Sequence, residues 1–174
     1  GFDEPFMMTE WGTIGYWEME TTSWGTPTEL TSSEKADVFL RAHNDVLSTF
    51  EGQLIGSYVF FWGQKQERTP TWFGLLTERG ELTEAADAMH RIWTGEWPAN
   101  RTPRVEAIRL DGKSYKESIV LTAGDTYVAV FDVVDPEGDP LTYRWEVKPE
   151  SESQKAGGDR EERLPNLEGI LSDS

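Results

Sequence analysis

One carboxylate is better placed for chemistry than any other in this sequence. The apolar run at residues 5–9 predicts a short buried strand, and Glu10 follows it directly, with Trp11 and Gly12 next. A carboxylate held at a strand end by its neighbours can act as a nucleophile and form a covalent ester intermediate. The alternative is a solvated or ion-paired loop residue, and Glu10 taken alone does not decide between the two.

Tryptophan is the second unusual feature, with eight copies in 174 residues. Trp11, Trp17 and Trp24 follow Glu10 closely, and Trp62 ends a later apolar run. Each indole has two interpretations. It can supply a large apolar area to a core, or its flat face can stack on the apolar face of a sugar.

These residues need elements to position them. Thr31 and Glu34 match a capping box and predict a helix from about residue 31, which Gly52 ends. The run 54–62 is almost wholly apolar and predicts a strand buried on both faces. A second helix is expected at 83–94, with Gly95 as its C-cap. The order strand, helix, strand, helix predicts two βα units, and active-site residues of parallel barrels lie at the C-terminal ends of strands.

The pattern changes after residue 98. Residues 99–104 are expected to form a linker, and residues 105–149 alternate in the way that predicts about four strands of a sandwich. Since such a sandwich needs about seven strands, it would be partial. The acidic segment 150–174 is expected to be a loop or a disordered tail. The remaining barrel strands would lie upstream and the remaining sandwich strands downstream.

Charge and composition exclude several functions. The net charge of −16 disfavours binding to nucleic acid. No apolar stretch is long enough to predict a transmembrane helix, and no signal peptide is visible. Because cysteine is absent, disulfides, thiol catalysis and cysteine-ligated metals are excluded. We expect no cofactor and no metal site. Asp135, Glu137 and Asp139 have the oxygen ligands that calcium prefers, but a tight turn is the favoured interpretation.

Two stretches resemble a known group of enzymes. TEWGTIGYWE at residues 9–18 is similar to the seventh-strand signature of clan A glycoside hydrolases, and GSYVFFWGQKQERTPTWFGLLTERGELT at 56–83 is similar to the eighth strand and loop. The nearest likeness is to the C-terminal part of family 2-like barrels. DPEGDPLTYRWEV at 135–147 resembles bacterial immunoglobulin-like modules of the polycystic-kidney-disease kind.

This resemblance implies a fold class: two C-terminal βα units of a (β/α)₈ barrel, residues 1–98, followed by a partial immunoglobulin-like sandwich. It also implies site residues. Glu10 would be the nucleophile of a retaining mechanism, Trp62 the floor of the reacting-sugar subsite, and Lys65 and Gln66 donors to sugar hydroxyls. Three further tryptophans would line the cleft: Trp11, Trp17 and Trp24.

The acid/base residue of that clan usually follows an asparagine at a strand end, and this sequence has no such Asn-Glu pair. We therefore expect a fragment of a retaining hydrolase of β-linked glycans that is inactive by itself. The alternative is a non-catalytic carbohydrate-binding or structural protein. The expected partner is an oligo- or polysaccharide, and the resemblance implies an extracellular or periplasmic location.

Overall fold

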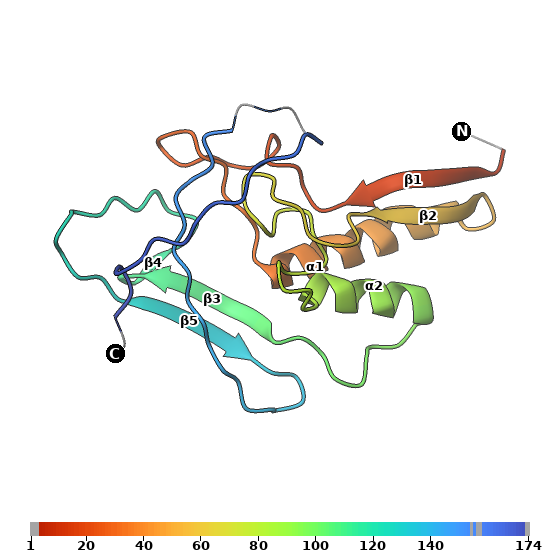
Figure 1. Cartoon of the computed structure of the whole chain (residues 1–174). Coiled ribbons are helices and arrows are strands. Elements are labelled where there is room, and N and C mark those ends of the chain that lie inside the picture. The colour runs from red at the N-terminus through yellow and green to blue at the C-terminus, as the bar shows by residue number, and fades with distance from the viewer. Residues whose placement is uncertain (1–3, 154, 156–157, 173–174) are drawn as a thin grey trace.

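The computed structural model describes residues 4–153, 155 and 158–172 (Figure 1). Its helices and strands follow one another in this order: β1 Phe6–Gly12, α1 Ser32–Arg41, a π-helical turn Ala42–Val46, a 3₁₀ turn Leu47–Phe50, β2 Leu54–Phe60, α2 Glu84–Thr94, β3 Arg104–Leu110, β4 Lys113–Ser114 and β5 Ala129–Val134. Long irregular segments separate them, and the longest follow β1, β2 and β5.

β1 and β2 form a two-stranded parallel sheet, and α1 lies in the connection between them. The register runs from Phe6 opposite Leu54 to Gly12 opposite Phe60, with one shift between Phe6 and Met7 and another between Met8 and Trp11. Because the strands are parallel, their C-terminal ends lie at the same edge of the sheet. The loops that leave β1 and β2 therefore start side by side, as Figure 1 shows.

The predicted start of α1 is confirmed. The Thr31 hydroxyl accepts a hydrogen bond from the Glu34 N–H, and the Glu34 carboxylate accepts one from the Thr31 N–H. These two bonds satisfy backbone donors that a helix start leaves free. The α-helix ends at Arg41, earlier than predicted, and the chain continues to Phe50 in π and 3₁₀ turns.

α2 packs against α1 and completes the core. Gly95 ends α2 in the left-handed region at φ 82°, which confirms the predicted C-cap. The helices contribute small and apolar side chains, Trp11 and Val59 reach the core from the strands, and Leu75 comes from the loop after β2. The buried cluster consists of Ala36, Phe39, Leu75, Ala85, Ala86, Ala88 and Met89.

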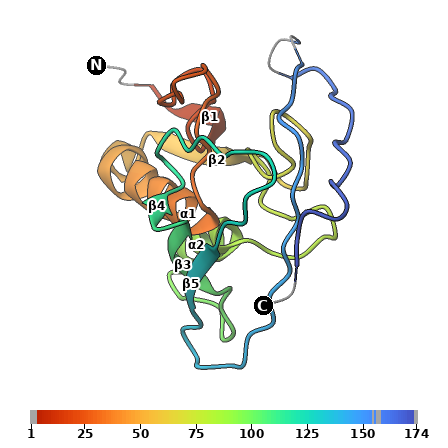
Figure 2. The same cartoon turned by 90° about the vertical axis from the view of Figure 1, so that its left-hand side faces the viewer.

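A second sheet has the strand order β4-β3-β5 and is antiparallel. Arg104, at the start of β3, bonds to Asp37 of α1 and to Glu84 of α2, each at 2.8 Å. The Val105 N–H donates to the Ser33 hydroxyl at 2.7 Å. These contacts fasten β3 to both helices, and Figure 2 shows β3 next to α1 and α2.

The fold-class prediction is wrong. The described residues contain two α-helices and two small sheets, one of two strands and one of three, rather than two βα units of a barrel followed by part of a sandwich. A barrel strand has a neighbour on both sides, whereas β1 and β2 pair only with each other in the described chain. A sandwich needs two facing sheets, and residues 141–148 do not join β5 as a strand.

The expected tail is irregular along its described part, and it contacts the loops. Glu150, Ser153 and Glu161 all bond to residues of the loops after β1 and β2. In Figures 1 and 2 this C-terminal segment runs beside the loop that follows β2. Residues 154, 156–157 and 173–174 of the expected tail lie outside the described residues, as do residues 1–3.

Candidate functional site

Glu10 lies near the C-terminal end of β1 with an exposed side chain. Its neighbour Trp11 turns toward the helices, and the Trp11 ring packs against Phe39 at a centroid distance of 5.6 Å. Glu10 lies in the part of β1 where the register with β2 shifts, and Thr9 and Glu10 are both exposed. Within the described part of the chain, its carboxylate has no hydrogen-bond or ion-pair partner.

The glycine two residues later has a geometric reason. A Cβ on Gly12 would lie 2.5 Å from the backbone oxygen of Phe60 on β2. A contact with a carbonyl oxygen at that distance forces the strands apart, so only glycine permits this approach. Gly12 therefore brings the end of β1, and Glu10 with it, close to the end of β2.

Trp17 and Trp24 are exposed on the loop that follows β1. Trp17 is 65% exposed, and its ring contacts Tyr16 at 4.9 Å and Phe73 at 6.2 Å. Trp24 is 48% exposed, and its indole N–H donates to Glu150 at 3.1 Å. Both indoles keep an area free for a flat apolar partner.

Trp62 is also exposed, at 57%, just beyond the end of β2. Its ring contacts Trp93 of α2 at 6.2 Å with a 40° tilt. Within the described residues, no ring contact joins Trp62 to Trp17 or Trp24. Trp62 therefore forms a separate aromatic surface with the C-terminal end of α2.

Lys65 and Gln66 are engaged within their own loop. The Lys65 ammonium bonds to the nearly buried carboxylate of Glu67 at 2.5 Å. Gln66 is 7% exposed, and its amide donates to the Arg68 carbonyl at 3.3 Å. A direct bond from Gln66 to a sugar would require this loop to rearrange, whereas Lys65 retains donor capacity.

The sequence did not single out Tyr16, which lies at the centre of an aromatic cluster. The Tyr16 ring meets Trp72 edge-on at 5.8 Å, and the Arg68 guanidinium lies 4.9 Å from the Tyr16 centroid. Trp72 is buried, and its indole N–H donates to the Ile14 carbonyl at 3.1 Å. This cluster fixes the loop carrying Trp17 onto the loop after β2. The run of adjacent aromatics at 16–17 was the available signal.

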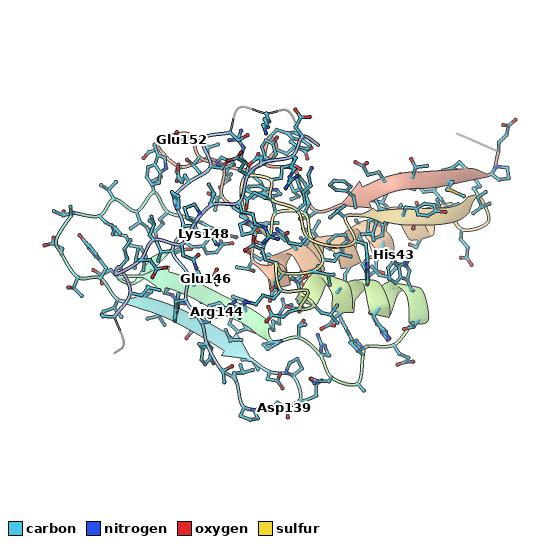
Figure 3. All side chains as sticks on the ribbon, viewed as in Figure 1. His43, Asp139, Arg144, Glu146, Lys148 and Glu152 are labelled. Atoms are coloured by element: carbon cyan, nitrogen blue, oxygen red, sulfur yellow. The ribbon has the colours of Figure 1, made fainter. Side chains whose placement is uncertain are left out.

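Two carboxylates of the acidic turn at residues 135–139 accept hydrogen bonds from backbone N–H groups. Asp135 accepts bonds from the N–H groups of Glu137 and Asp139, and Glu137 accepts one from the Arg101 N–H. Within the described residues, no group of three or more His, Cys, Asp or Glu side chains is suited to a metal ion. Figure 3 shows Asp139 at this turn, apart from Arg144, Glu146 and Lys148 on the segment that follows.

The strongest shifts in acidity lie at the junction of α1 with the second sheet. Burial opposes the charged form of Glu34, but hydrogen bonds from Lys116, Tyr115 and the Thr31 N–H outweigh it and lower the pKa of Glu34 to about 2. Burial and the bond to Glu34 raise the pKa of Tyr115. The bonds of Arg104 to Asp37 and Glu84 raise the pKa of Arg104, although burial opposes them. Glu34 with Tyr115 and Lys116 joins α1 to the chain beside β4, and Arg104 joins β3 to α1 and α2, so these groups hold the fold together.

A comparison with protein-family models finds no match to this chain, and a comparison with curated proteins finds no match either. The functional argument therefore rests on the residues themselves and on the resemblance of their motifs. Among the described residues, no helix combines the length and apolar character that crossing a bilayer requires.

Proposed function

We propose that this chain is part of a retaining glycoside hydrolase that acts on β-linked glycans, with Glu10 as its nucleophile. One observation carries the proposal. Glu10 presents an exposed carboxylate at the end of β1, beside the end of a parallel strand, and Gly12 permits that close approach. The resemblance of the Glu10-Trp11-Gly12 motif to a nucleophile strand supports the same role.

The chemistry follows from two carboxyl groups. In the first step a Glu10 oxygen bonds to the anomeric carbon, while a general acid gives its proton to the departing glycosidic oxygen. The products are a glycosyl ester on Glu10 and a shortened glycan. In the second step the acid, now a base, takes a proton from water, and the water oxygen displaces Glu10.

The second carboxyl group would come from a longer protein that contains this sequence. Retaining enzymes hold the two groups about 5–5.5 Å apart. The sequence has no Asn-Glu pair of the kind that supplies the acid/base residue in the resembled clan. We propose an extracellular or periplasmic site of action on the resemblance alone.

The aromatic residues divide into two roles under this proposal. Trp17, Trp24 and Trp62 have the exposed indole faces that sugar stacking needs. Trp11 packs against the core instead, which supports a positioning role for the strand that carries Glu10. Lys65 remains a candidate donor to sugar hydroxyls, and Gln66 would first have to leave the Arg68 carbonyl.

Chemical rescue tests the nucleophile in the longer protein. Glu10→Gly should abolish hydrolysis of aryl β-glycosides, and added azide should restore turnover and yield an α-glycosyl azide, because azide replaces the missing carboxylate. Glu51→Gln is the matched control, since Glu51 is an exposed carboxylate just before β2, at the opposite end of that strand. Rescue absent in Glu10→Gly, or activity retained by it, would contradict the assignment.

A second candidate is glycan binding without cleavage. The exposure of Trp17 and Trp24 on one loop favours it, because stacking on sugars does not require Glu10. Under this alternative the protein cleaves no glycan and Glu10→Gln leaves glycan affinity unchanged, whereas Trp17→Ala weakens binding. Affinity electrophoresis of the two variants in a series of β-glucans separates the candidates.

A further inference from the structure

A carboxylate of the C-terminal segment occupies a pair of hydrogen-bond donors on the loop after β1. The Trp24 indole N–H donates to one oxygen of Glu150 at 3.1 Å, and the Thr26 hydroxyl donates to the other oxygen at 2.6 Å. The pair therefore holds both oxygens of a single carboxylate. Because Glu150 is exposed, its side chain can turn into solvent and leave the two donors to another carboxylate.

The spacing of the two donors is fixed by their own turn rather than by Glu150. The Thr22 N–H donates to the Thr26 carbonyl at 2.8 Å, and the Gly25 N–H donates to the Thr22 carbonyl at 2.9 Å. The Thr26 N–H also donates to the Thr22 hydroxyl at 3.1 Å. Since these bonds close the turn without Glu150, a ligand that replaces Glu150 meets a preorganised pair of donors.

A cavity of about 440 Å³, within the range of small-molecule sites, adjoins this pair. Thr26 and Glu150 both line it, so a ligand that places its carboxylate where Glu150 does can extend into the cavity. Part of the wall is apolar and stiff, because three of its residues are prolines. This apolar part consists of Pro27, Pro70, Trp72, Pro149 and Leu164.

The hydroxyls of the wall offer both a donor and an acceptor. The Thr69 hydroxyl accepts a bond from the Thr71 N–H at 3.4 Å and keeps its own proton for a ligand. The Ser151 hydroxyl donates to Glu161 at 2.9 Å and keeps its lone pairs. Sugar hydroxyls both donate and accept, so they can pair with both groups, whereas a simple aliphatic acid cannot.

The charges that line the cavity favour an anion once Glu150 turns away. Arg68 and Lys148 line it, and Glu150 is the only carboxylate of the wall among the described residues. Lys148 lies 3.6 Å from Glu146 and 3.7 Å from Glu78, so its charge is largely balanced (Figure 3). The Arg68 guanidinium donates to a backbone carbonyl and, within the described chain, pairs with no carboxylate. Arg68 is therefore the main attraction for an anionic ligand.

We infer that Trp24, Thr26 and this cavity form a binding site for a uronic acid, a sugar whose ring carries a carboxylate, and that Glu150 competes for the site within the chain. The ligand carboxylate accepts from the Trp24 and Thr26 donors, and the sugar ring lies in the cavity against the prolines. The site does not include Glu10 and is tested by binding alone, so it holds or fails independently of the nucleophile assignment.

The Trp24 indole N–H reports on this site directly. The ¹⁵N-labelled 174-residue chain is titrated with the methyl glycosides of glucuronic acid and galacturonic acid, and Trp24→Phe assigns the indole resonance. At least one uronide should shift that resonance in a saturable way. Methyl glucoside lacks the carboxylate and N-acetylglutamate lacks the sugar ring, so each should bind at least tenfold more weakly.

Removal of one donor should weaken the binding of the uronide. Thr26→Val deletes the hydroxyl that bonds to the carboxylate and should lower the affinity at least fivefold. Thr28→Val is the matched control, because Thr28 is a half-buried threonine of the same loop that does not line the cavity. Its variant should bind within twofold of the unmodified chain, and equal losses in the two variants would overturn the proposal.

Removal of the internal competitor should strengthen binding. Glu150→Ala should raise the affinity for the uronide at least threefold more than Glu162→Ala does. Glu162→Ala removes the same charge from an exposed residue of the same segment outside this cavity, and so corrects for net charge. The proposal is also overturned if no uronide binds, if methyl glucoside or N-acetylglutamate binds as tightly as the uronides, or if the two glutamate variants gain equally.

Discussion

At the scale of single residues, the clearest electrostatic feature is Glu34. It caps α1 through Thr31 and also accepts bonds from Tyr115 and Lys116, beside β4. One carboxylate therefore stabilises both the helix start and the contact between α1 and the second sheet. Three hydrogen-bond donors to the Glu34 carboxylate explain why its charged form is favoured in spite of burial.

Glu34 should make stability depend on acid pH. Its pKa falls from an ordinary 4.5 to about 2 on folding, so its contribution is complete above pH 4.5 and is lost as pH falls toward 2. Urea unfolding between pH 2 and pH 6 should show that Glu34→Gln is less stable than the unmodified chain at pH 6, with the difference shrinking below pH 4.5. Glu51→Gln should keep the unmodified profile. A constant Glu34→Gln difference across this range would be inconsistent with the lowered pKa.

The sequence identified Glu10 as a strand-end carboxylate because an apolar run followed by a charge is a local signal. It failed to separate Trp11 from Trp17, since Trp11 packs against the helices whereas Trp17 lies exposed on the loop after β1. Trp11 packs on Phe39, 28 positions along the chain, and no local pattern encodes that contact. The partners of Lys65 and Gln66 depended in the same way on how their own loop folds.

At the scale of elements, the pairing of β1 with β2 depends on Gly12. Gly12→Ala should destabilise the chain by about 1–3 kcal/mol, because the new methyl group would meet the Phe60 carbonyl oxygen. Gly56→Ala lies in the same sheet, where a Cβ would be 3.9 Å from the Met7 side chain. It should be neutral or slightly stabilising.

Thermal or urea unfolding of the two glycine variants measures the difference. Equal stability of Gly12→Ala and Gly56→Ala would show that the two strands do not approach as closely as described. Comparison of these two variants also tests why glycine follows Glu10-Trp11 in the motif. The close backbone of β2, rather than a turn, requires glycine at this position.

The helix starts were predictable and their ends less so. Thr31 and Glu34 encode the beginning of α1 locally, and Gly95 encodes the end of α2. The change to π and 3₁₀ turns after Arg41 has no equally clear local signal, because Ala42, Val46 and Leu47 continue a helical spacing. Phe50 then packs edge-on against Phe6 of β1 at 5.3 Å, a contact that only the folded chain supplies.

At the scale of the whole molecule, Arg104 joins the helices to the second sheet. Arg104→Lys should lower the unfolding free energy by about 1–3 kcal/mol, because a lysine cannot reproduce charge-assisted bonds to Asp37 and Glu84 together. Arg109→Lys is the control, since the Arg109–Asp132 pair is about half exposed and should contribute less than about 1 kcal/mol. Similar losses for both variants would argue against a joining role for Arg104.

The fold class was mispredicted at this scale for a physical reason. Alternation in 105–149 indicates strands but not which strands pair, and residues 141–148 alternate without joining β5. The order strand, helix, strand, helix along the chain likewise does not show whether further strands pair with β1 and β2. The proposed division at 1–98, 99–104, 105–149 and 150–174 remains a prediction about folding units.

The purified 174-residue chain should hydrolyse no aryl β-glycoside, because the proposed reaction needs a second carboxyl group that the sequence does not supply in the expected motif. Release of nitrophenol from a panel of nitrophenyl β-glycosides measures this. Turnover above the rate of a Glu10→Gln preparation would place a complete active site within these residues.

The most direct test of the central claim is to trap the ester on Glu10. The longer protein is treated with 2-deoxy-2-fluoro β-glycosides that carry a good leaving group, digested, and mapped by peptide mass. The account predicts one sugar bound to Glu10, and the sugar that labels it names the substrate class. A label on another carboxylate, or cleavage of glycans with no label on Glu10, would contradict it.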